Sequence, residues 1–434
     1  FDTGSSELAR LTTAGRLGIG DNSPDRELVV KHATSNSTIK IESANTHTSQ
    51  LMFADSDGEQ VGRVAVFHGS GQVTSNSLTL DTAGTARVRI EPAGNVNISQ
   101  NLNVAGITTS QAFLPSEGQL ANRNLVINGA MRVAQRGTSS TSNGFHTIDR
   151  FAVNFDSGLT EAPTQAQVAL TSSDTPYSSG FRYALKITNG NQTSQSANDY
   201  IQIAQKIEAQ DVAQSGWNYT SSSSNITLSF WVKASIAQTM YARLNAEDAS
   251  RAYSFAFSAT TSWTKITKTI PGNSNLVFNN DNGVGIALYI IPFYGTSYTT
   301  SGHTNDAWIA DSGSNQVTDM ANTWFSGNDA TLEVTGVQLE VGPQVTTFEH
   351  RSFGEDLERC QRYYQEYTGV ANRIYAVNVY RSQYALPVQM RANPTFTKSY
   401  SVNTNLATDN TTATTKMFKW DIQYTGAGSG YIDI

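Results

Sequence analysis

A near absence of cysteine and a shortage of charge are the most restrictive features of this sequence. One of the 434 residues is cysteine, and charged residues make up 15%. The single thiol, Cys360, excludes a disulfide framework within the chain and a cysteine-rich zinc site. A chain of this length exceeds one ordinary core, so two to four domains are expected. Outside a cell, such a protein must gain stability by another route, and oligomerisation is the obvious one.

Other signatures are missing as well. No apolar run approaches the length that spans a bilayer, and Lys and Arg form no cluster within a net charge of −7. We therefore expect neither membrane insertion nor nucleic-acid binding. The six histidines are scattered without a zinc-binding spacing, and no phosphate-binding loop occurs, so no metal and no cofactor is predicted. Residues 55–58 (DSDG) favour a hairpin turn over a calcium loop, and a structural calcium ion elsewhere stays open.

Small polar residues fill much of the remainder. Many Ser, Thr, Asn and Gly with few charges suit a β-rich extracellular surface, and 10% aromatic residues argue against disorder. The chain begins at Phe1, in mid-motif and without a signal peptide. We therefore expect it to be the distal part of a longer protein.

The first hundred residues contain an internal repeat. Three ten-residue segments align without gaps: residues 10–19, 79–88 and 89–98. In each, apolar residues alternate on both sides of an Ala-Gly pair, and the glycine supplies the positive φ of a tight turn. Period-two alternation indicates half-buried strands, and residues 50–67 follow the same pattern. Such short hairpins bury too little to stand alone, so intertwined identical chains are expected in residues 1–100.

The middle of the chain predicts a sandwich. After a connector at residues 101–120, residues 121–351 alternate short apolar strands with turn-rich segments and show no long amphipathic helix. That pattern is typical of two packed sheets. The expected strands lie at residues 182–188, 226–234, 265–270, 285–293 and 330–339. Six aromatic residues in or beside strands are expected in the core: Phe230, Trp231, Tyr253, Phe255, Phe257 and Trp263.

One helix and a small β domain are predicted for residues 352–434. Ser352 and Glu355 have the spacing of a capping box at the start of a helix over residues 352–367. Leu357, Cys360, Tyr364 and Tyr367 share one helical face, so Cys360 is expected to be buried and inert. Strands are expected at residues 373–380 and 383–390.

Two blocks bracket the middle region. The first comprises residues 122–136 (NRNLVINGAMRVAQR) and 147–151 (TIDRF), and the second residues 334–364. Together they resemble the opening and closing blocks of a jelly-roll module in the tail fibres of tailed bacteriophages. Residues 15–20 (GRLGIG) are similar to the ending of repeats in fibre shafts. The blocks themselves are expected to be scaffold without binding residues.

The resemblance implies an all-β, intertwined homotrimeric fibre. Its parts would be a β-hairpin repeat shaft (1–100), the connector, a carbohydrate-binding-like jelly-roll head (121–351), and a short helix with a C-terminal β tip domain (352–434). It also implies a place in the virion, outside the cell, with upstream tail or baseplate proteins and a host surface glycan as partners.

Sugar recognition needs aromatic faces beside amides and carboxylates, because sugar rings present C–H groups on a face and hydroxyls at the edge. The long polar segment 294–325 exceeds what a hairpin needs and supplies both. The ligand-binding candidates are Tyr294, Tyr298, Asn305, Asp306, Trp308 and Trp324. Two alternatives stay open: the tryptophans are core anchors, or the C-terminal tip binds through Trp420, Tyr424 and Tyr431.

Cleavage of a glycosidic bond needs two carboxylates placed across it. No pair stands out in the sequence, so we expect no catalytic residue and a chain that is not an enzyme. The predicted function is recognition of, and adhesion to, the host cell surface through polysaccharide or lipopolysaccharide. The alternatives are a tailspike-type depolymerase that cleaves surface glycan and a purely structural fibre segment.

Overall fold

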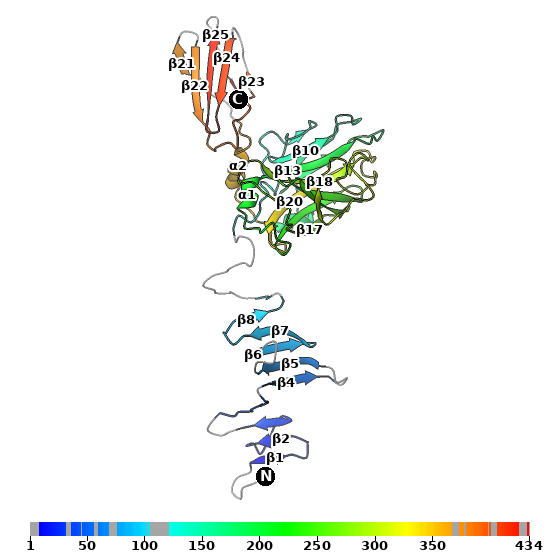
Figure 1. Cartoon of the computed structure of the whole chain (residues 1–434), viewed down its shortest axis with the longest axis vertical. Coiled ribbons are helices and arrows are strands. Elements are labelled where there is room, and N and C mark those ends of the chain that lie inside the picture. The colour runs from blue at the N-terminus through cyan, green and yellow to red at the C-terminus, as the bar shows by residue number, and fades with distance from the viewer. Residues whose placement is uncertain are drawn as a thin grey trace. The chain divides into compact units, whose positions relative to one another are not determined.

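The computed structural model is nearly all β and divides into two compact units, Phe1–Phe113 and Leu114–Ile434 (Figure 1). This confirms the all-β class expected from the alternating sequence. The structure describes residues 8–31, 36–44, 46–55, 60–68, 76–100, 102–104, 121–366, 373–376, 379–397, 399–400, 406–424 and 432–433. The division at residues 100, 120 and 351 and the assembly of three chains stay predictions.

The first unit is built from hairpins. A three-stranded sheet contains β1 (Ala9–Leu11), β2 (Leu17–Ile19) and β3 (Leu28–Val30). A five-stranded sheet runs in sequence order through β4 (Thr48–Ala54), β5 (Gln60–Phe67), β6 (Ser77–Thr82), β7 (Thr85–Ile90) and β8 (Val96–Ile98). The three aligned repeats are hairpins, as predicted, and Gly84 has the positive φ, 73°, that the turn after β6 requires.

One face of the five-stranded sheet is apolar and exposed among the described residues of the first unit. A row of paired residues crosses all five strands: Leu51, Val64, Leu80, Val88 and Ile98. Leu51 is 52% exposed and Leu80 is 45% exposed. The opposite face of β6 instead buries Thr79 and Asp81, and Asp81 pairs with Arg63 at 2.5 Å.

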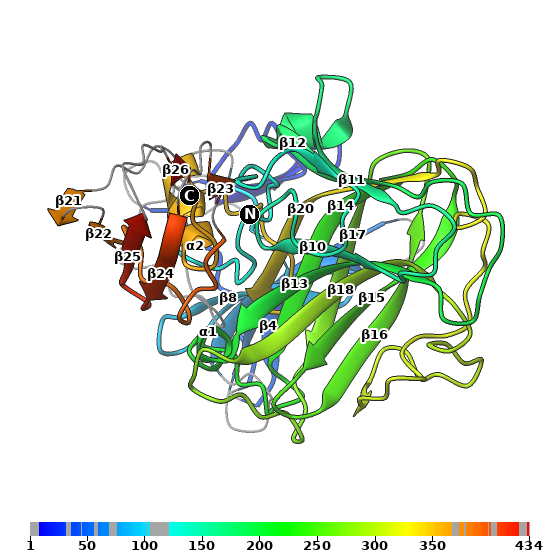
Figure 2. The same cartoon turned by 90° about the horizontal axis from the view of Figure 1, so that it is seen from above.

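Two six-stranded antiparallel sheets form a sandwich in the second unit (Figure 2). Sheet A has the order β10 (Phe151–Phe155), β13 (Tyr200–Glu208), β18 (Val284–Tyr294), β15 (Gln238–Ala246), β16 (Arg251–Ala259) and β19 (Trp308–Ala310). Sheet B has the order β17 (Thr264–Pro271), β14 (Asn225–Ala234), β20 (Thr331–Val341), β12 (Tyr183–Thr188), β11 (Thr164–Ala169) and β9 (Ser139–Ser140). All five strands expected for this region are present within one or two residues.

Aromatic side chains hold the two sheets together. Phe230 of β14 meets Phe257 of β16 edge to face, with ring centroids 5.3 Å apart. Such a contact adds about 0.5–1.5 kcal/mol to the burial of the rings. Five of the six aromatic residues expected in the core are buried, and Trp231 is half-buried. The strand pattern was sufficient to place them because alternate residues of a half-covered strand face inward.

The two bracketing blocks lie side by side. The side chain of Asn124 donates to the carbonyl of Val337 (3.1 Å) and accepts from the amide of Leu339 (3.0 Å). The carboxylate of Glu349 accepts from the amides of Arg123 and Asn124 at 3.1 and 3.0 Å. The opening and closing blocks therefore clamp the two ends of the sandwich together.

The helices are short. A 3-10 helix, η1 (Thr175–Ser179), and α1 (Ala209–Ala213) follow strands of the sandwich, and α2 (Phe353–Gln361) lies within the closing block. Ser352 and Glu355 form the predicted capping box of α2. Cys360 is buried as expected, whereas Tyr364 follows the helix and Tyr367 lies outside the described residues.

A four-stranded sheet follows α2. Its order is β21 (Arg373–Ala376), β22 (Val379–Ala385), β25 (Met417–Tyr424) and β24 (Leu406–Ala413), and β23 (Ser399–Tyr400) pairs with β26 (Ile432–Asp433). Phe418 is fully buried between Tyr384 and Phe396, at centroid distances of 5.1 and 4.8 Å. This region has its own small apolar centre, in keeping with the predicted β domain.

Candidate functional site

A cleft of about 330 Å³ opens on the outer face of sheet A, the face turned away from the sandwich core. Alternation along three neighbouring strands creates it. In β13, β15 and β18 the intervening residues are buried apolar ones, such as Ile201, Leu244 and Ile290. The cleft is lined by Tyr200, Gln202, Arg243, Asn245, Tyr289, Tyr294, Tyr298, Asp311, Gly313 and Gln316.

Three tyrosines form one wall of the cleft. The ring centroids of Tyr294 and Tyr298 are 5.4 Å apart, and Tyr200 lies 5.6 Å from Tyr298 and 6.4 Å from Tyr294. Tyr200 and Tyr298 are half-buried, whereas Tyr294 is buried and its hydroxyl donates to Gln202. Tyr200 and Tyr298 thus combine ring surface that is open to solvent with positions fixed by a third ring.

An ion pair forms the floor of the cleft. Arg243 is 3% exposed and pairs with Asp311, and its Nη1 donates to Gln316 at 3.3 Å. Asn245 donates to the same carboxylate at 3.3 Å. The Nε of Arg243 and the Oδ1 of Asn245 are buried without a hydrogen-bond partner among the described residues. Buried polar atoms are rarely left unpaired, so each is a point at which a ligand hydroxyl or a bound water is expected.

Three phenols of the cleft are held in their neutral form. Burial raises the pKa of Tyr200, Tyr289 and Tyr294 above the ordinary value of 10, and neighbouring tyrosines or carboxylates raise the pKa of Tyr200 and Tyr289 further. The cleft therefore presents O–H donors, amides and one neutralised ion pair. This chemistry suits an uncharged polyhydroxylated ligand.

Asp311, which lines the cleft, interacts electrostatically with a second carboxyl group, that of Glu247. Burial, and then the charge of Asp311, raise the pKa of Glu247, which directly follows β15. Asp311 in turn is ion-paired with Arg243. A carboxyl group with a raised pKa near a second carboxyl group is one feature that glycoside hydrolysis uses.

The structure separates the six residues that the sequence put forward for ligand binding. Tyr294 and Tyr298 lie in the cleft, and Asn305 donates to Thr318 at 2.7 Å within the loop. Asp306 is exposed and pairs with Lys268 at 2.6 Å. The remaining two candidates, Trp308 and Trp324, are buried in the core, which is the alternative that the sequence left open.

Both tryptophans are buried with their indole N–H groups satisfied. Trp308 donates to the carbonyl of Pro271 at 2.7 Å, and Trp324 donates to that of Thr331 at 3.0 Å. Neither ring is open to a ligand in this conformation. Of the alternative tip surface, Trp420 and Tyr424 belong to β25, and Tyr431 lies outside the described residues.

A polar chain pins the long loop to the edge of sheet A. His303 lies 2.5 Å from the hydroxyl of Ser254 through Nε2 and 2.8 Å from Asn315 through Nδ1. The order Ser–His–Asn is that of a nucleophilic triad. Ser254 is 2% exposed, however, so its hydroxyl has no room for a substrate. We assign this chain to anchoring of the loop.

Apart from Tyr294, the strand residues of the cleft were not among the candidates predicted from the sequence. Arg243 and Asn245 are two residues apart, as are Tyr200 and Gln202, and each pair interrupts a run of apolar residues. Polar residues at alternate positions of a buried strand were the signal that could have identified them. What the sequence could not supply is which strands are neighbours.

No metal or membrane site emerges from the described residues. Within them, His, Cys, Asp and Glu side chains form no group of three or more that could hold an ion. In the same part of the chain, no helix combines the length and apolarity needed to cross a membrane.

Comparisons with known proteins find likenesses among solved structures alone. No protein-family model and no curated protein matches the sequence. An arabinose-bound α-L-arabinofuranosidase aligns over 55% of this chain and 30% of its own, with 11% identity and a TM-score of 0.29. The enzymatically active domain of tailspike protein 4 of bacteriophage CBA120 aligns over 50% and 21%, with 8% identity and a TM-score of 0.26. A family 11 carbohydrate-binding module of Clostridium thermocellum aligns over 49% and 98%, with 10% identity and a TM-score of 0.24.

These similar structures correct one expectation from the sequence. We expected a chain that is not an enzyme. One of these structures is an α-L-arabinofuranosidase, and another is described as the enzymatically active domain of a tailspike protein. That expectation is wrong as drawn. It rested on the absence of a carboxylate pair, and the fold brings Glu247 and Asp311 together although 64 residues separate them. This chain aligns with less than a third of the length of each of these two proteins. Their activities therefore describe those proteins and not this chain.

Proposed function

We propose that this chain recognises a surface glycan through the cleft on sheet A, as part of a tail fibre or tailspike of a bacteriophage. The observation that carries the proposal is the cleft itself. Half-buried tyrosine rings stand beside buried polar atoms that lack partners, Nε of Arg243 and Oδ1 of Asn245. An apolar wall with a few fixed polar groups is the usual composition of a small-molecule site.

The geometry suits a sugar ring. The faces of Tyr200 and Tyr298 can stack on the C–H groups of a pyranose, while Gln316 and the Arg243–Asp311 pair can bond its hydroxyls. The volume of about 330 Å³ accommodates one or two sugar units. Because the one arginine is already paired with a carboxylate, a neutral sugar is favoured over an acidic one.

Assembly from three copies of the chain is supported by the first unit and by the resemblance of its repeats to fibre shafts. The apolar row that includes Leu51, Val64 and Leu80 is exposed in the described part of the first unit. A sheet with an apolar face must bury it against another element, and the same face of further copies is complementary to it. Three copies would also present three clefts to one cell surface, so weak sugar contacts would be strengthened.

Binding to an array of bacterial capsular polysaccharides and lipopolysaccharides tests the cleft. Tyr298→Ala removes an accessible ring and should weaken binding about tenfold or more. Tyr183→Ala, on β12 of sheet B, is the matched control because it removes an exposed ring from the opposite side of the sandwich. Equal binding by wild type and Tyr298→Ala would remove the site from this cleft. A monomer in sedimentation experiments would contradict the assembly.

A second candidate function is cleavage of the bound glycan. It is favoured by the raised pKa of Glu247 beside the ion-paired Asp311. In this mechanism Glu247 protonates the leaving oxygen and Asp311 acts as base or nucleophile. New reducing ends after incubation of the wild-type chain with a glycan that it binds, and their loss in Glu247→Gln, are the expected results. Persistence of the reducing ends in Glu247→Gln would exclude this pair.

A further inference from the structure

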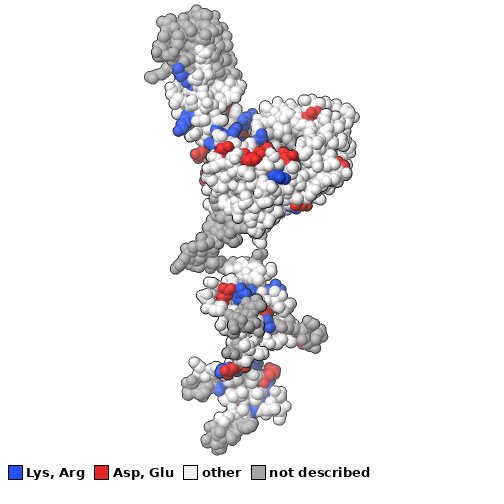
Figure 3. Space-filling view, in the orientation of Figure 1, with Lys and Arg blue, Asp and Glu red and all other residues white. Residues whose placement is uncertain are grey.

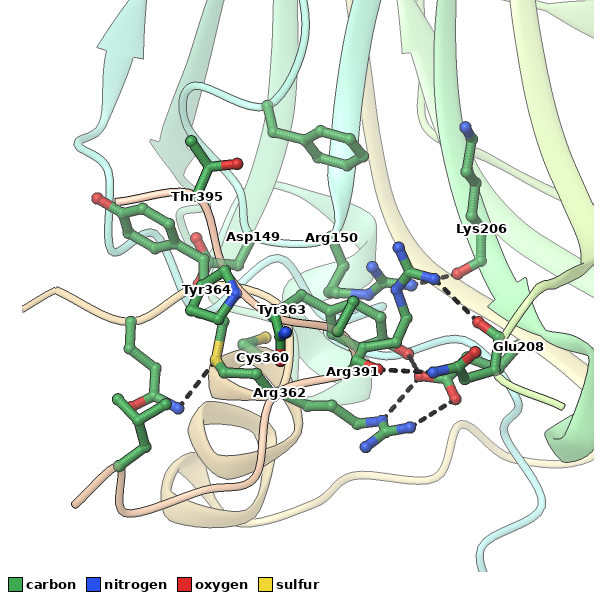
Figure 4. A pocket seen from close by; sticks show the side chains of 18 of the residues that line it. Asp149, Arg150, Lys206, Glu208, Cys360, Arg362, Tyr363, Tyr364, Arg391 and Thr395 are labelled. Carbon is green, nitrogen blue, oxygen red and sulfur yellow. Dashed lines mark hydrogen bonds and ion pairs between the residues drawn. The ribbon is translucent and has the colours of Figure 1, made fainter. Parts of the chain in front are cut away.

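A larger pocket, of about 760 Å³, lies where α2 and the segments after it meet the sandwich (Figure 4). We call it the α2 pocket. Its walls come from the opening block, the end of β13, residues 360–366 and residues 386–397. The opening and closing blocks, which were expected to be scaffold, therefore also line a pocket.

The α2 pocket is positively charged, although the chain as a whole carries −7. Five basic residues line it: Arg136, Arg150, Lys206, Arg362 and Arg391. Three carboxylates lie among them: Asp149, Glu208 and Glu366. Charged side chains of both signs also gather around α1 and α2 on the surface, whereas most of the visible sandwich surface is uncharged (Figure 3).

Two of the carboxylates are already neutralised. Glu208 accepts from Nε and Nη2 of Arg362, both at 2.8 Å, and from the hydroxyl of Tyr363 at 2.5 Å. Asp149 lies 3.6 Å from Arg136 and accepts from Gln135. Arg362 and Arg136 are thus committed to these acids, and the remaining arginines have no such partner.

Arg150 is the exceptional residue. It is 7% exposed, its guanidinium stacks at 3.3 Å on the ring of Tyr363, and it donates to the carbonyl oxygen of Lys206. Its Nε has no hydrogen-bond partner, and no carboxylate lies within ion-pair distance in the described part of the chain. Burial lowers its pKa, and Arg391 lowers it further against the opposite effect of Tyr363 and Glu208. A buried guanidinium without a counter-charge is unfavourable.

Arg391 also has no carboxylate within ion-pair distance among the described residues. It is exposed, and its Nη1 donates to the carbonyl of Asn282 at 2.9 Å, which also anchors the segment to the sandwich. Two guanidinium groups that share one pocket, repel each other and bond carbonyl oxygens are the arrangement that an oxyanion completes. The rings of Phe145, Tyr364 and Phe396 line the same pocket and offer apolar surface to the body of a ligand.

We propose that the α2 pocket binds the anionic group of an acidic saccharide, a carboxylate or a phosphate, between Arg150 and Arg391. The site is separate from the cleft on sheet A and does not depend on the function proposed for that cleft.

Three probes that differ at one carbon test the proposal by calorimetric titration: glucose, glucuronate and glucose 6-phosphate. The chain should bind one or both of the charged probes and not glucose. Binding of glucuronate alone points to an acidic capsule, and binding of glucose 6-phosphate alone points to a phosphorylated glycan. Raised salt should weaken the interaction. Absence of saturable binding of both charged probes would overturn the proposal.

Variants locate the site. Arg391→Gln removes an exposed charge and should weaken binding about ten- to hundred-fold, the range for a charge-assisted contact. Arg150→Gln should do the same, and if it fails to fold, Arg391→Gln decides alone. Arg182→Gln, an exposed arginine that bonds Tyr177, is the matched control and should bind as the wild type does. If Arg391→Gln binds the charged probes as the wild type does, the assignment is refuted. It is also refuted if Arg391→Gln changes the oligomeric state and leaves binding of the charged probes unaffected.

Discussion

Replacing Asp311 by Ala should destabilise the sandwich through Arg243, which stays in place. Arg243 is 3% exposed, and in the variant its guanidinium would retain one side-chain bond, to Gln316. Removing one partner of a buried ion pair costs about 3–5 kcal/mol. The side chain of Asp311 is 33% exposed, so water already solvates part of the pair. We therefore expect a smaller loss, about 2–3 kcal/mol of unfolding free energy.

A double-mutant cycle measures this coupling. Urea unfolding, followed by tryptophan fluorescence, would compare Asp311→Ala, Arg243→Met and the double variant with the wild type. The double variant should cost less than the sum of the single variants, with a coupling of about 1–3 kcal/mol, because it leaves no unpaired buried charge. The denaturant slope should stay constant, since the sandwich itself is retained.

A surface pair provides the control, and additivity would refute the reasoning. Asp306 pairs with Lys268 at 2.6 Å but is 57% exposed, so Asp306→Asn should cost less than about 1 kcal/mol. Asn is used because residue 306 has a positive φ, 62°, which Asn tolerates and Ala does not. If Asp311→Ala costs no more than Asp306→Asn, Arg243 is not held by this carboxylate. If the single effects add within about 0.5 kcal/mol, the two residues do not act as a pair.

Three further predictions concern the scaffold. Gly129→Ala should abolish soluble expression, because a Cβ at residue 129 would lie 2.0 Å from the carbonyl oxygen of Val337; Gly302→Ala, in open space, should not. Burial raises the pKa of Glu349, but backbone amides and Arg351 outweigh it and bring the pKa below the ordinary 4.5. The contribution of Glu349 to folding stability is therefore present above pH 4.5 and is lost as pH falls through the lowered pKa. Urea midpoints should therefore fall less steeply below pH 4.5 in Glu349→Gln than in the wild type. Burial raises the pKa of Cys360, so the thiol should react with a thiol reagent at pH 8 at the rate of unfolding, and faster labelling in native buffer would contradict its burial.

Local patterns predicted the fold well and the candidate site in part. Alternation in residues 226–234 was sufficient for β14, and the spacing of Ser352 and Glu355 was sufficient for the start of α2. Tyr298 could be identified because it lies in a long polar loop beside a strand. Arg243 could not, because its role depends on the pairing of β15 with β18, which lies more than 40 residues further along the chain.

The same limit explains the tryptophans and the arginines. Trp324 belongs to a polar segment, and only the return of that segment onto Gln238 buries its ring. Arg150 lies in a motif that the sequence assigned to scaffold, and its lack of a counter-charge follows from the commitment of Glu208 to Arg362. Which partner a charged residue lacks is a property of the folded chain and has no signature along the sequence.

The clamp between the two blocks makes the sandwich an insertion into a continuous chain. Arg359 of α2 donates to Asn122 at 2.8 Å, so the polypeptide leaves the sandwich beside the point at which it entered. A domain whose ends meet can be exchanged without moving what precedes or follows it. The sandwich can therefore be replaced as one unit at these two blocks, because both of its ends lie at the same place.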